Sequence, residues 1–125
     1  MDWQNALKKL NAALARLDYL CDSLGDEIQE GRLLSSLKPT FEHLDSAAES
    51  GSWEVPSVRD PSRMIKSAAI RPYLDWSRIK LRNIVSRISH KLGEGDESLN
   101  EVFVIRRIGT IRGELEMAWL VGASR

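Results

Sequence analysis

Residues 106–121 read RRIGTIRGELEMAWLV, and they lie in a segment whose apolar spacing is typical of an α-helix. The segment begins at residues 98–101, SLNE, which match a capping box, and it extends to about residue 121. A helix that is apolar on two sides needs two neighbours, and this segment has two apolar faces. One face carries Val104, Ile108, Ile111, Leu115, Ala118 and Trp119, and the other carries Val102, Gly109, Gly113, Met117 and Leu120.

The second face contains two glycines, Gly109 and Gly113, four residues apart. Each destabilises a helix by about 1 kcal/mol relative to alanine. Three interpretations are open. A second helix approaches closely at the small residues, as in small-xxx-small contacts between membrane helices. Alternatively, Gly109 breaks or kinks the helix, or the glycines contact a ligand. The first interpretation predicts that this second face is a partner interface.

Two further segments predict long helices. Residues 2–24 place Trp3, Leu7, Leu10, Leu14, Leu17, Cys21 and Leu24 at alternating spacings of four and three, which is a coiled-coil seam. Asp2 is the expected N-cap, and Gly25 the expected stop. Residues 61–92 begin at the helix-start pair Asp60-Pro61 and precede Gly93, and Pro72 is expected to kink or divide this helix near Arg71. Their predicted core stripe is Leu74, Leu81, Ile84, Val85, Ile88 and Leu92.

The middle of the chain has weaker periodicity. Residues 26–38 predict a short helix, and Pro39 suits the first position of another helix over 39–49. A loop with two prolines follows near 50–60, where Trp53 and Val55 are expected to attach to the core. Strand patterns are nearly absent. We therefore expect one all-α domain over residues 1–125, a bundle of four to six helices with coiled-coil-like packing and three long helices at about 2–24, 61–92 and 98–121.

The composition argues against several functional classes. No signal peptide or apolar run of membrane-spanning length occurs, so we expect a soluble and intracellular protein. His43 and His90 lack the paired spacing of a zinc site, and Cys21 on the seam predicts a small buried apolar residue. No nucleophile elbow and no phosphate-binding glycine motif is present. We expect no catalytic residue, metal or cofactor, and hence not an enzyme.

Residues 106–121 resemble the closing helix of small all-α accessory proteins encoded among the head and packaging genes of tailed phages. Those helices often pair an Arg/Gly-rich turn with a Trp or Leu ending. The resemblance covers about 16 of the 125 residues and transfers no functional residue. It implies a role in a phage particle or in its assembly.

The charge is zero overall but unevenly distributed. Residues 1–50 hold five basic and nine acidic residues, whereas residues 59–91 hold nine basic and two acidic ones. The basic segment can contact nucleic acid phosphates, with Tyr73 and Trp76 stacking on bases. It can equally form ion pairs with the acidic N-terminal half of a bundle. The candidate cations nearest the core stripe are Arg78, Lys80, Arg82, Arg87 and Lys91.

Trp76 and Ile79 point away from the predicted core stripe of residues 61–92. A monomer would expose both, and exposed apolar patches are a common mark of an interface. We therefore add them to the predicted partner interface. The expected function is a non-enzymatic interaction or oligomerisation module of a larger complex, which binds itself or another protein. The alternative is a small nucleic-acid-binding regulator or packaging protein.

Overall fold

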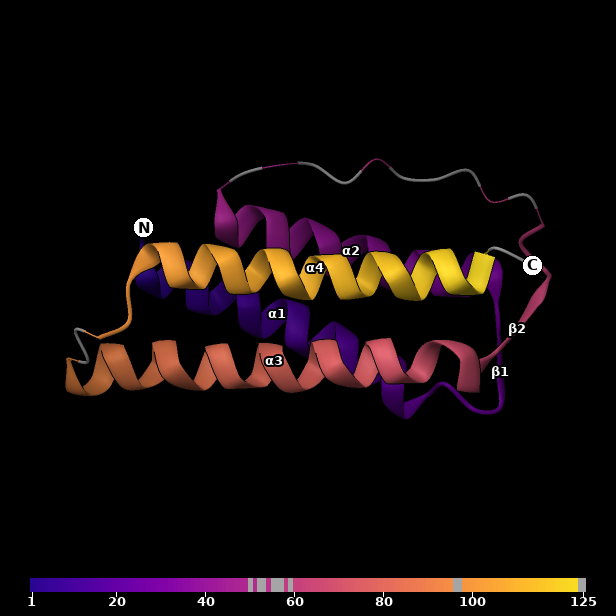
Figure 1. Cartoon of the computed structure of the whole chain (residues 1–125), viewed down its shortest axis with the longest axis horizontal. Helices are drawn as coiled ribbons and strands as arrows, with labels where there is room; N and C mark the ends of the chain where they lie inside the picture. Colours follow the sequence, from indigo (N-terminus) through magenta and orange to yellow (C-terminus); the bar gives the residue numbers. More distant parts are fainter. Residues whose placement is uncertain (50, 52–53, 55–57, 59, 96–97, 124–125) are drawn as a thin grey trace.

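The computed structural model describes residues 1–49, 51, 54, 58, 60–95 and 98–123, and these form a helical bundle with one small β-ribbon (Figure 1). The elements follow in the order α1 (Trp3–Asp22), β1 (Glu27–Gln29), α2 (Glu30–Ala48), β2 (Met64–Lys66), α3 (Ser67–Glu94) and α4 (Glu101–Ala123). The prediction of a largely helical bundle is confirmed, and the expected absence of strands is wrong.

The four described helices form a ring in which each helix packs against two neighbours. Helix α1 packs against α2 and α3, and α4 packs against the same two helices. Figure 1 shows α1 and α4 running in one direction along the bundle and α2 and α3 in the other, so every contacting pair is antiparallel. The β-ribbon and the end of α4 lie at the same end of the bundle.

The inner face of α4 matches its prediction. Val104, Ile108, Ile111, Leu115, Ala118 and Trp119 are all buried. The buried face of α1 is broader than the predicted seam, because Ala6, Ala13 and Leu20 share it. Leu10, Leu17, Cys21 and Leu24 are buried as expected, whereas Trp3, Leu7 and Leu14 are partly buried.

The prediction of two short helices between residues 26 and 49 is wrong. A single helix, α2, passes through Pro39 without interruption. The apolar side chains on both sides of the proline lie on one buried face, which holds Leu33, Leu34, Leu37, Phe41 and Leu44. An interior proline costs about 3 kcal/mol. Burial of several large side chains on one continuous helix outweighs that cost, since each contributes about 1.5–3 kcal/mol.

The β-ribbon explains why α3 does not begin at Asp60-Pro61 as predicted. Strands β1 and β2 pair antiparallel, with Ile28 opposite Ile65, and only these two central side chains are buried. Each strand has three residues, which is too short for a strand pattern to be visible in the sequence.

The segment before β2 contains a turn and is hydrogen-bonded to the start of α2. The backbone N–H groups of Glu30 and Gly31 donate to the carbonyls of Arg63 and Pro61, at 2.8 and 3.1 Å. These bonds replace the missing side-chain cap of α2. They also require a glycine, because a Cβ at position 31 would lie 3.0 Å from Pro61 Cβ. The Asp60 carboxylate accepts from Ser62 in a turn instead of capping a helix.

Helix α3 is continuous over its 28 residues, so Pro72 does not divide it. The predicted stop at Gly93 is also wrong, because the helix ends at Glu94 and Gly95 adopts the left-handed capping conformation, with φ of 73°. Leu74, Leu81, Ile84 and Ile88 are buried as predicted. Val85 is only partly buried, and Leu92 is exposed.

Helix α4 begins slightly later than the capping box suggested. The Asn100 side-chain carbonyl accepts from the Phe103 backbone N–H at 2.9 Å, so Asn100 caps the helix rather than Ser98. The predicted attachment of Trp53 and Val55 to the core lies outside the described residues.

Candidate partner interface

The outer face of α4, defined as Val102, Ile105, Gly109, Gly113, Met117 and Leu120, is open to solvent. Val102 is 58% exposed, Leu120 57% and Met117 43%. A Cβ added at Gly109 or Gly113 would meet no atom within 4 Å beyond their chain neighbours and local helix backbone. The helix runs unbroken from Glu101 to Ala123, so the interpretation in which Gly109 breaks it is wrong. Among the described residues, no second helix packs on the glycines.

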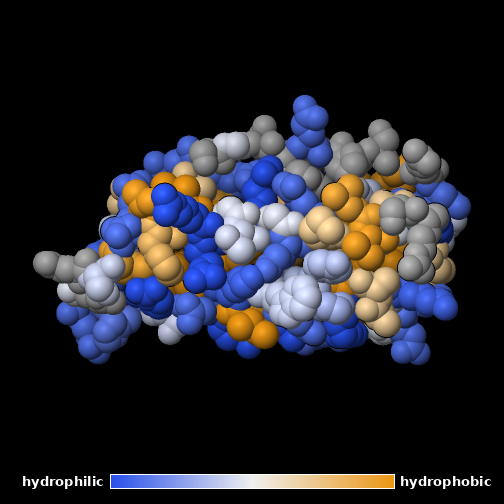
Figure 2. Space-filling model, in the orientation of Figure 1, coloured by the Kyte–Doolittle hydropathy of each residue, from blue (hydrophilic) through white to orange (hydrophobic). Residues whose placement is uncertain are grey.

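A second exposed apolar patch lies on α3 beside this face. Trp76 is 52% exposed and Ile79 61% exposed, as their position off the core stripe predicts. Trp76 packs edge-on against Tyr73, with 5.6 Å between ring centroids. Trp76 and Ile79 line a shallow groove of about 350 Å³ between α3 and α4, together with Lys80 and Glu114. Figure 2 shows apolar residues gathered at both ends of α4, with paler residues between them.

The sequence reasoning missed one residue of the outer face. Ile105 is 36% exposed and lies one turn from Val102 and Gly109. Its signal was present in the helical periodicity, since positions three and four apart share a face. Tyr19, Met64 and Leu92 are further exposed apolar side chains, on other parts of the surface.

On the α1 side of α3, the predicted nucleic-acid cations form ion pairs with acidic residues of α1. Arg78 lies 3.9 Å from Asp18, 3.7 Å from Asp22 and 3.2 Å from Asp75. Arg82 lies 3.1 Å from Asp18. The acidic N-terminal half therefore supplies partners for the basic segment on this side of the bundle.

The cations on the other side of α3 also have partners within the chain. Lys80 pairs with Glu114 of α4, whose carboxylate lies 3.4 Å from the Ser77 hydroxyl. The Arg87 guanidinium lies over the Phe103 ring at 4.7 Å, and the Lys91 ammonium lies 5.0 Å from the centre of the Trp3 ring. All five candidate cations thus contact other groups of the chain.

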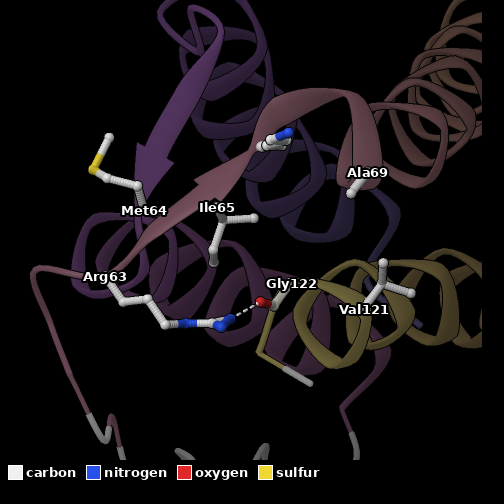
Figure 3. A pocket seen from close by; sticks show the side chains of 7 residues that line it. Arg63, Met64, Ile65, Ala69, Val121 and Gly122 are labelled. Atoms are coloured by element: carbon white, nitrogen blue, oxygen red, sulfur yellow. Dashed lines mark hydrogen bonds between the residues drawn. The ribbon is translucent and has the colours of Figure 1, made fainter. Parts of the chain in front are cut away.

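At the ribbon end of the bundle, Arg63, which lies directly before β2, joins α2 and α4, and Figure 3 shows its hydrogen bond to Gly122. Its Nε lies 3.6 Å from a carboxylate oxygen of the buried Glu30, and its Nη2 donates to the Gly122 carbonyl at the end of α4. Ile65 and Gly122 also line a small pocket of about 170 Å³ here. A Cβ at Gly122 would lie 3.1 Å from Ile65 Cδ1, so this glycine permits close packing inside the chain.

The cysteine and the exposed histidine, which could carry chemistry, have surroundings that explain them without a catalytic role. Cys21 is buried, and burial raises the pKa of its thiol, which keeps the thiol protonated and unreactive. His90 is exposed, and its Nδ1 lies 3.6 Å from a Glu94 carboxylate oxygen. Within the described residues, no three potential ligands gather to hold a metal. No described helix is both long and apolar enough to cross a bilayer.

Comparisons with protein-family models, with curated proteins and with solved structures found no match to this chain.

Proposed function

We propose that this chain is a non-enzymatic protein–protein interaction module, which assembles with itself or with another protein of a larger complex. One observation carries the proposal. The outer face of α4 exposes four large apolar side chains around two glycines that no described part of the chain covers. Large apolar side chains that gather in exposed patches on one helix face are a common mark of interaction sites.

The glycines strengthen the proposal because they reduce the stability of the isolated chain. Each lowers helix stability by about 1 kcal/mol relative to alanine. Neither has a positive φ or a close neighbour that would require glycine. We therefore attribute these glycines to a contact with a partner outside the isolated chain. A backbone that approaches closely is one such contact.

Two finer expectations belong to this proposal. Coiled-coil-like packing, expected from the heptads of residues 2–24, is proposed for the helices of the module. An accessory role in a tailed-phage particle or in its assembly is the specific form that the resemblance of residues 106–121 favours. The nucleic-acid alternative has less support, since the five candidate cations have intramolecular partners.

Measurement of mass in solution, with and without a short DNA duplex, tests the proposal. We expect association that increases with concentration and does not require DNA. Gly113→Leu should reduce it, because leucine fills the space that a partner backbone would occupy. Gly93→Leu is the matched control, since Gly93 also lies in a helix with no neighbour within 4 Å but belongs to α3 and not to the outer face of α4.

Trp76→Ser tests the contribution of α3. It should weaken association while leaving the unfolding of the monomer nearly unchanged, because the indole is half exposed. Submicromolar DNA binding that falls steeply with salt, by a wild type that does not self-associate, would favour the nucleic-acid alternative instead.

A further inference from the structure

The order of residues along the outer face of α4 is the same when read from either end. Positions at equal distances from Ile111 carry residues of the same kind. Val102 corresponds to Leu120, Ile105 to Met117, and Gly109 to Gly113. Val102 and Leu120 lie about five turns apart and therefore point in the same direction. The apolar residues form a straight strip about 27 Å long with the two glycines at its centre.

The charged residues of the strip break this symmetry in one informative way. Arg106 and Glu116 are also equidistant from Ile111, and they carry opposite charges. Arg106 is exposed, and it forms no ion pair with another described residue. Glu116 is 39% exposed and lies 3.0 Å from Arg112 on its own helix, which leaves it open to a second cation.

We infer that the outer face of α4 pairs with the same face of a second copy of this chain, with the two helices antiparallel and the two-fold axis crossing the contact at the level of Ile111. The inference rests on the proposed function and specifies its partner. In this arrangement, Val102 of one copy lies level with the partner's Leu120, and Gly109 with the partner's Gly113. Arg106 lies level with the partner's Glu116, twice in each dimer.

The charges select this orientation over its alternative. In a parallel pair, Arg106 would lie level with the partner's Arg106, and Glu116 with the partner's Glu116. Like charges at equal levels repel, whereas the antiparallel pair brings two opposite pairs together. The interface is then isologous and closes as a dimer instead of extending into a fibre.

The exposed residues of α3 add to this interface. A two-fold axis perpendicular to α4 in the plane of contact keeps α3 of both copies on the same side. Trp76 and Ile79 therefore border the same edge of the interface in both copies. A strip about 27 Å long and one helix wide covers about 300 Å², below the roughly 800 Å² per partner of a standard interface. We accordingly expect a weak dimer that depends on both helices.

Site-specific cross-linking tests the orientation. A mixture of Val102→Cys and Leu120→Cys should give a covalent dimer with a bismaleimide about 10 Å long, and each variant alone should not, because like positions are about 27 Å apart. Wild type, whose single Cys21 is buried, is the control. Suppose that the wild type is dimeric by mass but that Val102→Cys or Leu120→Cys alone gives a covalent dimer. This result would overturn the antiparallel orientation and leave the proposed function intact.

Charge reversal gives a second, independent test. Arg106→Glu should raise the dimer Kd by about tenfold, since it turns two attractive pairs into repulsive ones. The double variant Arg106→Glu/Glu116→Arg should return the Kd towards the wild-type value. Arg16→Glu, an exposed site on α1, is the matched control for charge. If the double variant had the same Kd as the single variant Arg106→Glu, the inferred pairing of Arg106 with Glu116 would be contradicted.

A wild type that stays monomeric at hundreds of micromolar would rule out the second copy as partner. Docking on a different protein would then be the surviving form of the proposed function. Failure of the inference is therefore distinguishable from failure of the function.

Discussion

The two faces of α4 have opposite relations to the rest of the chain, and their glycines show the difference. On the inner face, Gly122 is buried, and a Cβ there would lie 3.1 and 3.3 Å from Ile65 and Ile70. On the outer face, a Cβ at Gly109 or Gly113 would meet nothing within 4 Å. Packing within the chain explains the first glycine. Packing within the described residues does not explain the other two, and the proposed function attributes them to a contact with a partner.

The largest expected contrast is between two leucines of the same helix. Leu115 is fully buried, and Leu115→Ala should lower the free energy of unfolding by about 2–5 kcal/mol. Leu120 is 57% exposed, and Leu120→Ala should change the free energy of unfolding of the monomer by no more than about 0.5 kcal/mol. Urea unfolding at low protein concentration measures both. A similar loss of unfolding free energy in the two variants would show that another part of the chain covers the outer face in the monomer.

A charged pair gives the next contrast. Arg63→Met leaves the buried Glu30 carboxylate without its cation, and loss of one partner from a buried pair costs about 3–5 kcal/mol. Because the Arg63 side chain is 25% exposed, we expect about 1–3 kcal/mol. Arg106→Met on the outer face is the control and should be nearly neutral. Equal thermal unfolding of the two variants would contradict the structural role of Arg63.

Enlarging the glycines sharpens the comparison. Gly122→Leu should destabilise the monomer by about 1–3 kcal/mol through overpacking against Ile65 and Ile70. Gly113→Leu should not destabilise the monomer and should raise its stability slightly, because leucine is a better helix former than glycine and the site is open, but it should weaken association. Denaturant unfolding combined with solution mass separates these effects. Loss of monomer stability in Gly113→Leu comparable to that in Gly122→Leu would indicate a hidden neighbour of Gly113.

The smallest expected effect is an increase in the stability of the monomer. Gly113→Ala should stabilise the diluted monomer by about 1 kcal/mol, because alanine loses less backbone entropy and meets no neighbour. Gly109→Ala should do the same. The result to check is an increased urea midpoint with an unchanged slope. A decreased midpoint would remove the argument that these glycines lower the stability of the isolated chain.

Much of the candidate interface was predictable from the sequence because it depends on one helix. Once α4 is recognised as a helix, its period places Gly109 and Gly113 opposite the apolar core face. The same reasoning placed Trp76 and Ile79 outside the core stripe of α3. Which partner each cation of α3 contacts was not predictable, since Asp18 and Glu114 are distant from these cations in the chain and only packing brings them together.

The sequence alone determined which residues of α4 are buried and which are left outside, because a helical period is a local property of the chain. It also indicated a helical bundle in which an acidic N-terminal half, residues 1–50, can form ion pairs with the basic residues of α3. Only the tertiary structure decided the continuity of α2 through Pro39, the start of α3 at Ser67 and the β-ribbon. The ribbon depends on hydrogen bonds between residues 26–31 and 61–67. Such bonds join segments far apart in the chain, and no local pattern encodes them.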